Sequence, residues 1–338
     1  NTPFLLENRR RMTVTVRQHI VECLEAHKGE YVSGEELAAG IGVSRAAVWK
    51  TIQGLQEEGY QIDSMPRRGY CLALESDILS REGIRPFLDS RWKDIPIWVH
   101  DRLDSTNQEV KRLAAEGAPH NTVVIARAQT AGRGRLGRSF ASPQEGGLYM
   151  SVLLRPCVSA SLAVDVTTLA AVSVCRAIEK GSDKKPMIKW VNDIFLNGKK
   201  VCGILTEAVS DVETGMIDSL VLGIGINVTT PPEAFPPEVR QIAGPVFEPG
   251  EKSIPKNELA ANLLNEVLGH AEELGSHRHM EEYRKRCFIL GKNVRFHKEE
   301  KDYTGVAKEI CDDGSLLVAL DQGGDIRLQS GEVSVRTD

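Results

Sequence analysis

The sequence predicts a multidomain α+β protein: a winged helix-turn-helix at the N-terminus, an α/β domain on one main sheet in the centre, and a small β-barrel at the C-terminus. Three observations support this prediction. Helical spacing followed by a short hairpin occupies the first 74 residues, strand-like and helical runs alternate through the middle, and short alternating strands follow from Gly291 onward. At 338 residues, the chain is also longer than one core usually organises.

The composition is that of an ordinary folded protein. Hydrophobic residues make up 41% and charged residues 26%, which excludes disorder, and the net charge of −5 does not by itself indicate a nucleic-acid partner. No run of about 18 apolar residues is present, so we expect no membrane-spanning helix and no membrane partner. The N-terminus lacks the order of a signal peptide, and Met12 is the candidate natural start if residues 1–11 are an expression remnant.

The cysteines and histidines indicate in which compartment the protein works and whether it binds a metal. Seven cysteines are scattered without a C-x-x-C pair, which favours a reducing cytoplasm over a disulfide framework. Among the histidines only His277 and His279 lie close together, with no third ligand nearby. We therefore expect no metal site there.

Three helices are predicted in the first domain. The apolar spacing of residues 16–24 predicts the first, a Ser-x-x-Glu capping box at residues 33–36 begins the second, and Ser44 caps a third that runs to Glu58. The second and third helices are joined by a glycine-containing turn, which is typical of a helix-turn-helix. Two short strands within residues 60–72 would form the wing.

One face of the third helix and the tip of the wing form the predicted DNA-contact surface of this domain, which we place at residues 12–74. The side chains assigned to it are Ser44, Arg45, Ala46, Lys50, Gln53, Arg67 and Arg68. Residues 43–56 hold two basic residues and no acidic one, which suits phosphate contacts. Residues 1–74 nevertheless carry nine basic and nine acidic residues, so a helical protein-interaction module is the alternative.

The rest of the chain divides into two predicted domains. Residues 78–287 form the central one, because strand-like runs such as VVIARA, LYMSVLL and SLVLGIGINV alternate with helical runs. Within it, residues 229–255 hold seven prolines and are expected to form a long surface loop, before a helical region interrupted near Gly275. Residues 288–338 hold five short strands separated by turns, which predicts the small barrel.

The segment QTAGRGRLGRSF at residues 129–140 is the most informative in the chain. Its glycines fit G-x-G-x-x-G, but a dinucleotide site needs an acidic residue about 20 positions later, and none stands there. A P-loop interpretation meets a different obstacle, because Arg138 occupies the position of the required lysine. Neither standard nucleotide motif describes this segment well.

The charges of the same segment point to another kind of site. No acidic residue lies between Glu116 and Glu145, whereas Arg127 and three loop arginines do. Guanidinium groups bind phosphate in a planar fork, and glycines let the backbone approach a ligand. We therefore predict a loop that binds phosphate or an adenylate and is mobile until the ligand arrives. An exposed flexible loop is the alternative.

Three further motifs accompany the loop. D-S-T-N at residues 104–107 begins a helix, where Thr106 can start a capping box or the hydroxyls can bind a small polar ligand. K-W-V-N-D at residues 189–193, with Lys200 after it, offers charge neutralisation for a nucleotide and a carboxylate for Mg²⁺. G-I-G-I-N at residues 223–227 leaves room for a ligand against the strand, or marks a close sheet crossing.

In order and spacing, these four motifs resemble those of biotin–protein ligases, and the arginine-glycine loop is the most specific of them. With the N-terminal helix-turn-helix, the chain is similar over nearly its whole length to the bifunctional biotin ligases and biotin-operon repressors of bacteria. The resemblance implies a mixed central sheet and an SH3-like barrel. Phe140 stands where the family often has Trp, and Val191 stands where it often has Pro.

The resemblance assigns roles to individual residues. Those implied to bind biotin are Ser105, Thr106, Asn107, Gln129, Gly132, Arg133, Lys200, Gly223 and Gly225. Those implied to bind the nucleotide are Arg133, Arg135, Arg138, Phe140, Asn192, Asp193, Asn227 and Arg336, with Asp193 also a ligand for Mg²⁺. Lys200 would neutralise carboxylate and α-phosphate oxygens during adenylation, and Arg135 would keep the adenylate from leaving.

The resemblance also implies partners and regulation. ATP, Mg²⁺ and biotin are the expected ligands, biotinyl-5′-AMP is the expected intermediate and corepressor, and a lysine of a biotin carboxyl-carrier protein is the expected acceptor. Adenylate binding would favour a homodimer that sets two winged helices on operator DNA. Three alternatives remain: a lipoate–protein ligase, a ligand-sensing transcription factor without catalysis, and a ligase whose N-terminal domain does not bind DNA.

Overall fold

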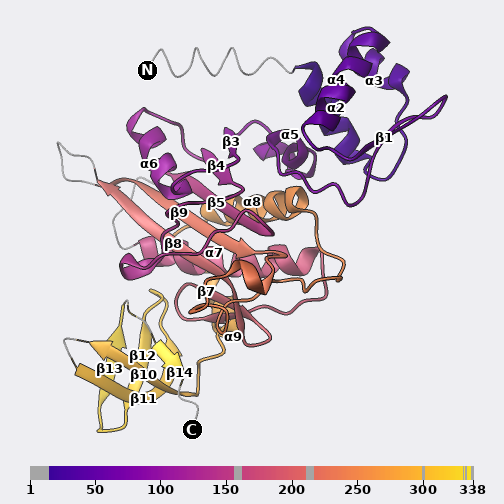
Figure 1. The fold of residues 1–338 in the computed structure, drawn as a ribbon. Helices are drawn as coiled ribbons and strands as arrows, with labels where there is room; N and C mark the ends of the chain where they lie inside the picture. Colours follow the sequence, from indigo (N-terminus) through magenta and orange to yellow (C-terminus); the bar gives the residue numbers. More distant parts are fainter. Residues whose placement is uncertain are drawn as a thin grey trace.

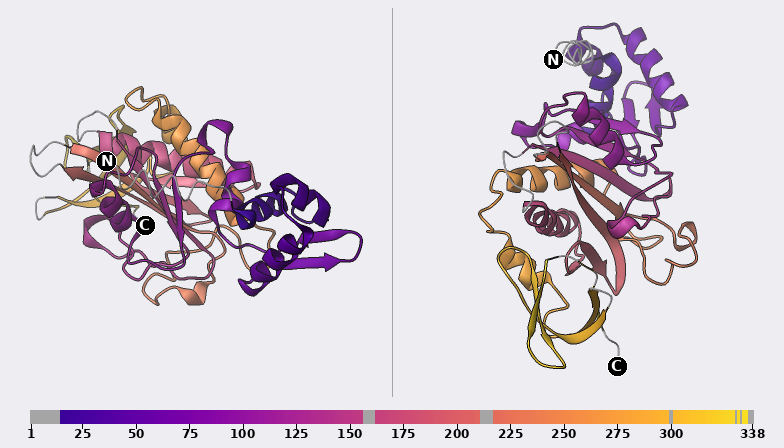
Figure 2. Two further views of the ribbon diagram at one scale, coloured as in Figure 1. Left: turned by 90° about the horizontal axis from the view of Figure 1, so that it is seen from above. Right: turned by 90° about the vertical axis from the view of Figure 1, so that its left-hand side faces the viewer.

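The computed structural model describes residues 15–155, 162–210, 217–298, 301–329, 331 and 333–335. Met12 and Arg336 therefore lie outside the described residues. Three units follow one another along the molecule, and the N-terminal and C-terminal units lie at opposite ends of the central one (Figures 1 and 2). Each unit has its own β-sheet, of two, seven and five strands in chain order of the domains. Within the described ranges, no helix has the length and apolar character needed to cross a membrane.

The N-terminal unit is the predicted winged helix-turn-helix. Its elements are α2 (Val16–Ala26), α3 (Gly34–Ile41), α4 (Arg45–Glu57), β1 (Ile62–Met65) and β2 (Gly69–Leu72). The predicted capping box at the start of α3 is present, and the Ser44 hydroxyl accepts a hydrogen bond from Ala47 N at 3.2 Å at the start of α4. Apolar side chains from all three helices and both strands form one core cluster.

The central sheet is mixed, as predicted. Its strands are β3 (Ile97–His100), β4 (Val123–Ala126), β5 (Gly147–Leu154), β6 (Met187–Lys189), β7 (Asp193–Leu196), β8 (Lys199–Ser210) and β9 (Ile217–Asn227). They are ordered β3-β4-β5-β9-β8-β7-β6, with β3 and β4 parallel and the remaining neighbours antiparallel. Strands β8 and β9 are the longest and run through the middle of the sheet (Figure 1).

Helices cover both faces of this sheet. On one face lies α6 (Thr106–Ala115), whose Val110 and Leu113 pack on Val124, Leu153 and Val221. On the other face lie α7 (Leu162–Lys180) and α8 (Lys256–Ala271), which contribute to the largest core cluster. The shorter helices are α5 (Arg81–Ile84), η1 (Arg85–Phe87), η2 (Ser90–Trp92), η3 (Arg135–Gly137), η4 (Pro232–Ala234) and α9 (Met280–Arg286).

Two local expectations need correction. The strand β7 was not anticipated, because it has only four residues and its first, Asp193, is the last residue of the K-W-V-N-D motif. The proline-rich residues 229–255 are mostly irregular, as expected, but they are not purely a surface loop. Phe235, Val246 and Phe247 are each no more than 2% exposed, since apolar side chains anchor the loop in the core.

The C-terminal unit is a curled antiparallel sheet of five strands (Figure 2), the small β domain that the sequence predicts. Its strands are β10 (Asn293–Lys298), β11 (Lys301–Ile310), β12 (Leu316–Leu320), β13 (Asp325–Leu328) and β14 (Val333–Val335). They are ordered β13-β12-β11-β10-β14. Buried residues of this sheet, such as Val294 and Leu316, belong to the same core cluster as the central domain, so the two units share one core.

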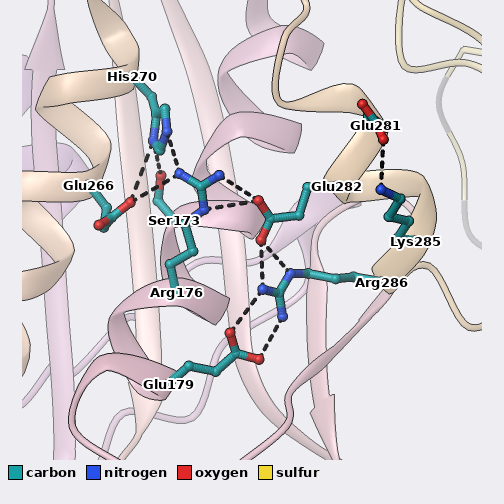
Figure 3. A network of polar contacts seen from close by, with 9 residues as sticks. All are labelled: Ser173, Arg176, Glu179, Glu266, His270, Glu281, Glu282, Lys285 and Arg286. Atoms are coloured by element: carbon teal, nitrogen blue, oxygen red, sulfur yellow. Dashed lines mark hydrogen bonds and ion pairs between the residues drawn. The ribbon is translucent and has the colours of Figure 1, made fainter.

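A network of alternating charges joins α7, α8 and α9 (Figure 3). Arg176 donates to Glu282 at 2.5 Å, and Arg286 donates both to Glu282 at 2.6 Å and to Glu179 at 2.8 Å. His270 on α8 lies 2.7 Å from Arg176. Because these groups are partly buried and each charge meets an opposite one, the network fixes α9 against α7.

Candidate functional site

A cavity of about 140 Å³ lies where the four motifs meet. Its lining includes Ser105, Thr106, Asn107, Gln129, Arg133, Arg135, Leu136, Arg138, Phe140, Lys189, Trp190, Asn192, Asp193, Lys200, Gly203, Gly223, Gly225, Gly331 and Val333. Segments that are far apart in the sequence thus form one site. The last two residues belong to the C-terminal unit, which therefore forms part of the wall.

The arginine-glycine loop closes one side of the cavity as a tight hairpin. Gly134 N donates to Arg138 O at 2.7 Å, and Phe140 N donates to Gly132 O at 2.8 Å. A Cβ on Gly132 would lie 2.4 Å from the carbonyl oxygen of Phe140, so only glycine fits this crossing. Leu136, at the tip, is 73% exposed. The predicted mobility of this loop remains a prediction.

At the start of α6, the structure replaces the expected capping box with longer-range contacts. Ser105 occupies the N-cap position, and no side-chain hydrogen bond caps the helix. The backbone N–H of Thr106 donates to Gln129 Oε1 at 2.8 Å, and its hydroxyl lies 2.7 Å from that of Ser151. Gln129 in turn donates to the hydroxyl of Ser142 at 2.8 Å. The polar groups of this end of the cavity therefore support one another.

Asn107 is held by two polar partners, the buried Ser151 and the partly buried Glu207. Its amide nitrogen donates to Glu207 at 2.7 Å, so its Oδ1 faces the hydroxyl of Ser151 as an acceptor, at 2.6 Å. Burial opposes ionisation of Glu207, but hydrogen bonds from Lys111 and Asn107 outweigh it and hold the pKa of this carboxyl below its ordinary value. A Cβ on Gly223 would lie 2.2 Å from Asn107 Oδ1, which explains the glycine there.

The glycines of β8 and β9 form a flat floor, and an aromatic ring lies on it. A Cβ on Gly203 or Gly225 would lie 2.9 Å or 2.5 Å from the ring of Phe140. This ring also meets Tyr149 edge-on, with ring centroids 6.4 Å apart. The alternating glycines thus allow another group to approach the sheet closely. In this structure that group is the ring of Phe140.

Three cationic groups of the cavity face polar partners. Lys200 Nζ lies 2.7 Å from Asp193 Oδ1, and Arg135 Nη1 donates to Asn192 Oδ1 at 3.0 Å. With the Gln108 amide turned so that its oxygen faces the guanidinium, that oxygen accepts from Arg133 at 2.5 and 2.7 Å. Positive charge is thereby arranged along one wall of the cavity, which adjoins the hydroxyl-rich end at Arg133 and Gln108.

Some predicted site residues lie elsewhere. Asn227 does not line the cavity; its amide nitrogen donates to Gly244 O at 3.3 Å, and the side chain is 3% exposed. Arg336 lies outside the described residues. Arg127 pairs with Asp101 at 3.0 Å, away from the cavity. In the described ranges no cluster of three metal-ligating side chains occurs, and His277 instead contacts Asp165 at 3.1 Å.

The predicted DNA-contact residues lie at the start and along one face of α4 and in the turn between β1 and β2. All of them are exposed: Ser44, Arg45, Ala46, Lys50, Gln53, Arg67 and Arg68. Val48, Ile52 and Leu55 on the opposite side of α4 are buried, as the helical spacing predicts. Arg68, in the turn at the wing tip, stacks on the Tyr31 ring at 4.3 Å, which holds this turn against the segment before α3.

Several residues that shape the site escaped sequence reasoning. They are Gln108, Ser142, Ser151, Glu207 and Tyr283. Ser151 is fully buried and is the lone serine in the apolar strand LYMSVLL, a signal that could have drawn attention to it.

Comparisons with known proteins agree with this arrangement. Residues 99–227 match the biotin/lipoate A/B protein ligase family, residues 16–71 match an HTH domain, and residues 289–336 match the biotin protein ligase C terminal domain. The bifunctional ligase/repressor BirA of Bacillus subtilis (strain 168) is 34% identical over 324 residues, covering 92% of this chain and 96% of that protein. The chain belongs to the biotin/lipoate A/B protein ligase family.

Two further biotin ligases are similar to this chain at lower identity. The bifunctional ligase/repressor BirA of Escherichia coli (strain K12) is 29% identical and covers 90% of this chain and 95% of its own length. The structure of the biotin protein ligase from Aquifex aeolicus in complex with biotin and ATP has a TM-score of 0.61 and 29% identity, covering 72% of this chain and 99% of that one. This family member thus has the ligase fold together with an N-terminal HTH domain.

Proposed function

We propose that this protein is a biotin–protein ligase, which joins biotin to a lysine of a biotin carboxyl-carrier protein through biotinyl-5′-AMP. The observation that carries the proposal is the single cavity in which a hydroxyl- and amide-lined end adjoins an arginine- and lysine-lined wall. A neutral urea-like head and a charged phosphate need those two environments side by side. The similarity to a bifunctional ligase/repressor and to a biotin protein ligase supports the same activity.

The neutral end is assigned to biotin. Ser105, Thr106, Asn107 and Gln129 supply polar groups there, although several of these groups are already hydrogen-bonded within the protein. The residues that complete this half of the proposed site are Gly132, Arg133, Lys200, Gly223 and Gly225.

The charged wall is assigned to ATP. Arg133, Arg135, Arg138, Phe140 and Asn192 are the proposed nucleotide contacts on the cavity, with Asn227 and Arg336 as further candidates outside its lining. Asp193 is a partly buried carboxylate on the cavity, which is the kind of ligand Mg²⁺ prefers, so one cation held by Asp193 and substrate phosphates fits the residues present. When bound, Mg²⁺ would neutralise phosphate charge.

The chemistry requires positioning and charge stabilisation, not a protein nucleophile. A carboxylate oxygen of biotin attacks the α-phosphorus of ATP, the bond to the bridging oxygen of the β-phosphate breaks, and pyrophosphate leaves. The neutral amine of the acceptor lysine then attacks the carbonyl carbon, AMP leaves, and the proton lost from the amine passes to solvent. Lys200 and Arg135 face the charge that builds up on the phosphate in both steps.

A regulatory role is proposed for the N-terminal domain. The exposed residues on α4 and the wing tip would contact operator DNA, with biotinyl-5′-AMP as corepressor and a homodimer as the binding species. The HTH domain and the bifunctional relatives support this part. We place the domain limits at residues 12–74, 78–287 and 288–338 and the protein in the cytoplasm.

A transfer assay tests the proposal. The purified protein is incubated with ATP, Mg²⁺, biotin and a carboxyl-carrier domain, and the acceptor is weighed by mass spectrometry. The expected result is one biotinyl group on one lysine, a mass increase equal to biotin minus the water lost when the amide forms. Transfer of lipoate in place of biotin would support a lipoate–protein ligase, and DNA binding without any transfer would support a non-catalytic regulator.

A further inference from the structure

We propose that Tyr283 is a positioning residue for the nucleotide half of the site. Its hydroxyl donates to the backbone carbonyl of Val191 at 3.0 Å and so holds the segment whose next two residues, Asn192 and Asp193, line the cavity. The inference rests on the proposed function, because it assigns a role in ATP binding to a residue that does not itself line the cavity.

The direction of this hydrogen bond is fixed by its partners. A backbone carbonyl can only accept, so the Tyr283 hydroxyl is the donor. The tyrosine is fully buried on α9, and burial raises its pKa well above the ordinary value, which keeps the hydroxyl protonated. A buried hydroxyl without a hydrogen-bond partner lowers the stability of the folded state. The fold therefore favours the conformation in which the Tyr283 hydroxyl makes this bond.

Neighbouring contacts hold the same segment from other sides. Trp190 Nε1 donates to Gly314 O at 2.9 Å, and this glycine belongs to the turn between β11 and β12 of the C-terminal unit. Asn192 Nδ2 donates to Ile204 O at 2.8 Å on β8. The cavity face of Asn192 then accepts from Arg135 at 3.0 Å. Residues 190–192 are thus clamped between α9, β8 and the C-terminal unit.

The charge network of Figure 3 fixes the position of α9, the helix that carries Tyr283. Glu282, the residue before Tyr283, accepts from both Arg176 and Arg286 (Figure 3). Because Arg176 belongs to α7, α9 cannot shift along α7 without breaking these ion pairs. Tyr283 therefore presents its hydroxyl from a fixed position, and the place of Asn192 and Asp193 depends on it.

A purely structural role would give a different kinetic result. A variant that only loses stability has fewer folded molecules, which lowers the apparent kcat and leaves the KM values of the folded fraction unchanged. A misplaced segment at residues 190–193 instead weakens ATP binding in every folded molecule. Separate KM values for ATP and biotin therefore distinguish the two.

The test is Tyr283→Phe, which keeps the ring and removes only the hydroxyl. In the biotin-transfer assay with the full chain, we expect the KM for ATP to rise about tenfold and the KM for biotin to stay within about twofold. The matched control is Ser151→Ala, which removes a buried hydroxyl at the other end of the cavity. It should raise the KM for biotin and leave that for ATP unchanged.

The inference fails if Tyr283→Phe leaves the KM for ATP within twofold of the wild-type value, or if it raises both KM values equally. Should this variant be less stable, its two KM values are measured at a temperature at which circular dichroism shows it folded, and the same outcomes decide. A wild-type protein that transfers no biotin would contradict the proposed function itself, a result distinguishable from either variant's behaviour.

Discussion

Lys200 and Asp193 form an ion pair in the cavity wall, and bound substrates can replace either partner. Their charged atoms lie 2.7 Å apart, and both side chains keep roughly a quarter of their surface exposed, at 28% and 22%. Both groups are largely buried, so each needs an opposite charge whenever the pair separates. A carboxylate or phosphate of the substrates can therefore replace Asp193 as the partner of Lys200, while Asp193 binds a cation.

We expect Lys200→Ala to lower the rate of adenylation by at least about a hundredfold, because it removes the cation that meets the developing phosphate charge. Biotin binding should persist in part, since the neutral end of the cavity is untouched. Pyrophosphate release measures the first effect and calorimetry the second. The control is Lys199→Ala, whose Nζ contacts the Gln241 carbonyl at 2.6 Å outside the cavity. Full turnover in Lys200→Ala would remove this residue from the site.

Arg135 links the loop to the segment beneath it through its 3.0 Å bond to Asn192. Arg135→Gly should remove both this link and a phosphate contact, so that biotinyl-5′-AMP escapes before transfer. Free adenylate reacts with any exposed amine, so bystander proteins added to the reaction should become biotinylated. Mass spectrometry of the bystander measures this. Arg127→Ala, which alters a guanidinium paired with Asp101 outside the cavity, should remain selective. Unchanged selectivity of Arg135→Gly would contradict the assigned role.

At the scale of elements, local pattern predicts helices and strands better than it predicts their contacts. The caps of α3 and α4 were read correctly because their partners lie three residues away. At Thr106 the same local rule failed, since the polar partners are Gln129 and Ser151, on other elements. Motif order and spacing were enough to predict which segments share the cavity. They could not predict Tyr283, which comes from a short helix without any motif.

The contact between α2 and α8 is an element-level feature with a titratable group at its centre. Glu25 is 2% exposed and accepts from Asn257 Nδ2 at 2.9 Å, while Asn257 Oδ1 accepts from Ser80 N at 3.0 Å. Lys28 lies 3.5 Å from the same carboxylate. Burial raises the pKa of Glu25, and the contacts with Lys28 and Asn257 only partly oppose this. The N-terminal domain is thus joined to the catalytic domain through a buried carboxyl.

This raised pKa predicts a pH-dependent effect of Glu25→Gln. Protonation of Glu25 stabilises the folded chain fully below the unfolded pKa, about 4.3, and this stabilisation is lost as pH rises through the raised folded pKa. At neutral pH the variant should therefore melt no lower than the wild type. As pH falls towards about 4.3, the melting temperature of the wild type should rise relative to that of the variant. Calorimetric melting across this range checks the trend, and a difference in melting temperature that is constant with pH would contradict it.

Across the whole molecule, the two proposed activities are far apart. The proposed DNA-contact surface lies on the N-terminal unit, at the opposite end from the C-terminal unit that helps to wall the cavity (Figures 1 and 2). The winged helix has its own apolar core, whereas the ligase and C-terminal units share one. Substitutions on the exposed face of α4 should therefore disturb DNA binding without disturbing catalysis.

The double variant Arg45→Ala with Lys50→Ala tests that separation. Each basic side chain that neutralises a phosphate contributes about 0.9 to the slope of log affinity against log salt, so the slope should fall by about two per protomer. The probe is a duplex selected from a randomised library with the wild-type protein, biotin and ATP. Biotin transfer should match the wild type. Arg278→Ala with Lys285→Ala removes two exposed charges from the ligase domain and controls for net charge. If the salt slope of the α4 variant equals that of this control, α4 does not contact DNA, and the protein is a ligase whose N-terminal domain serves another purpose.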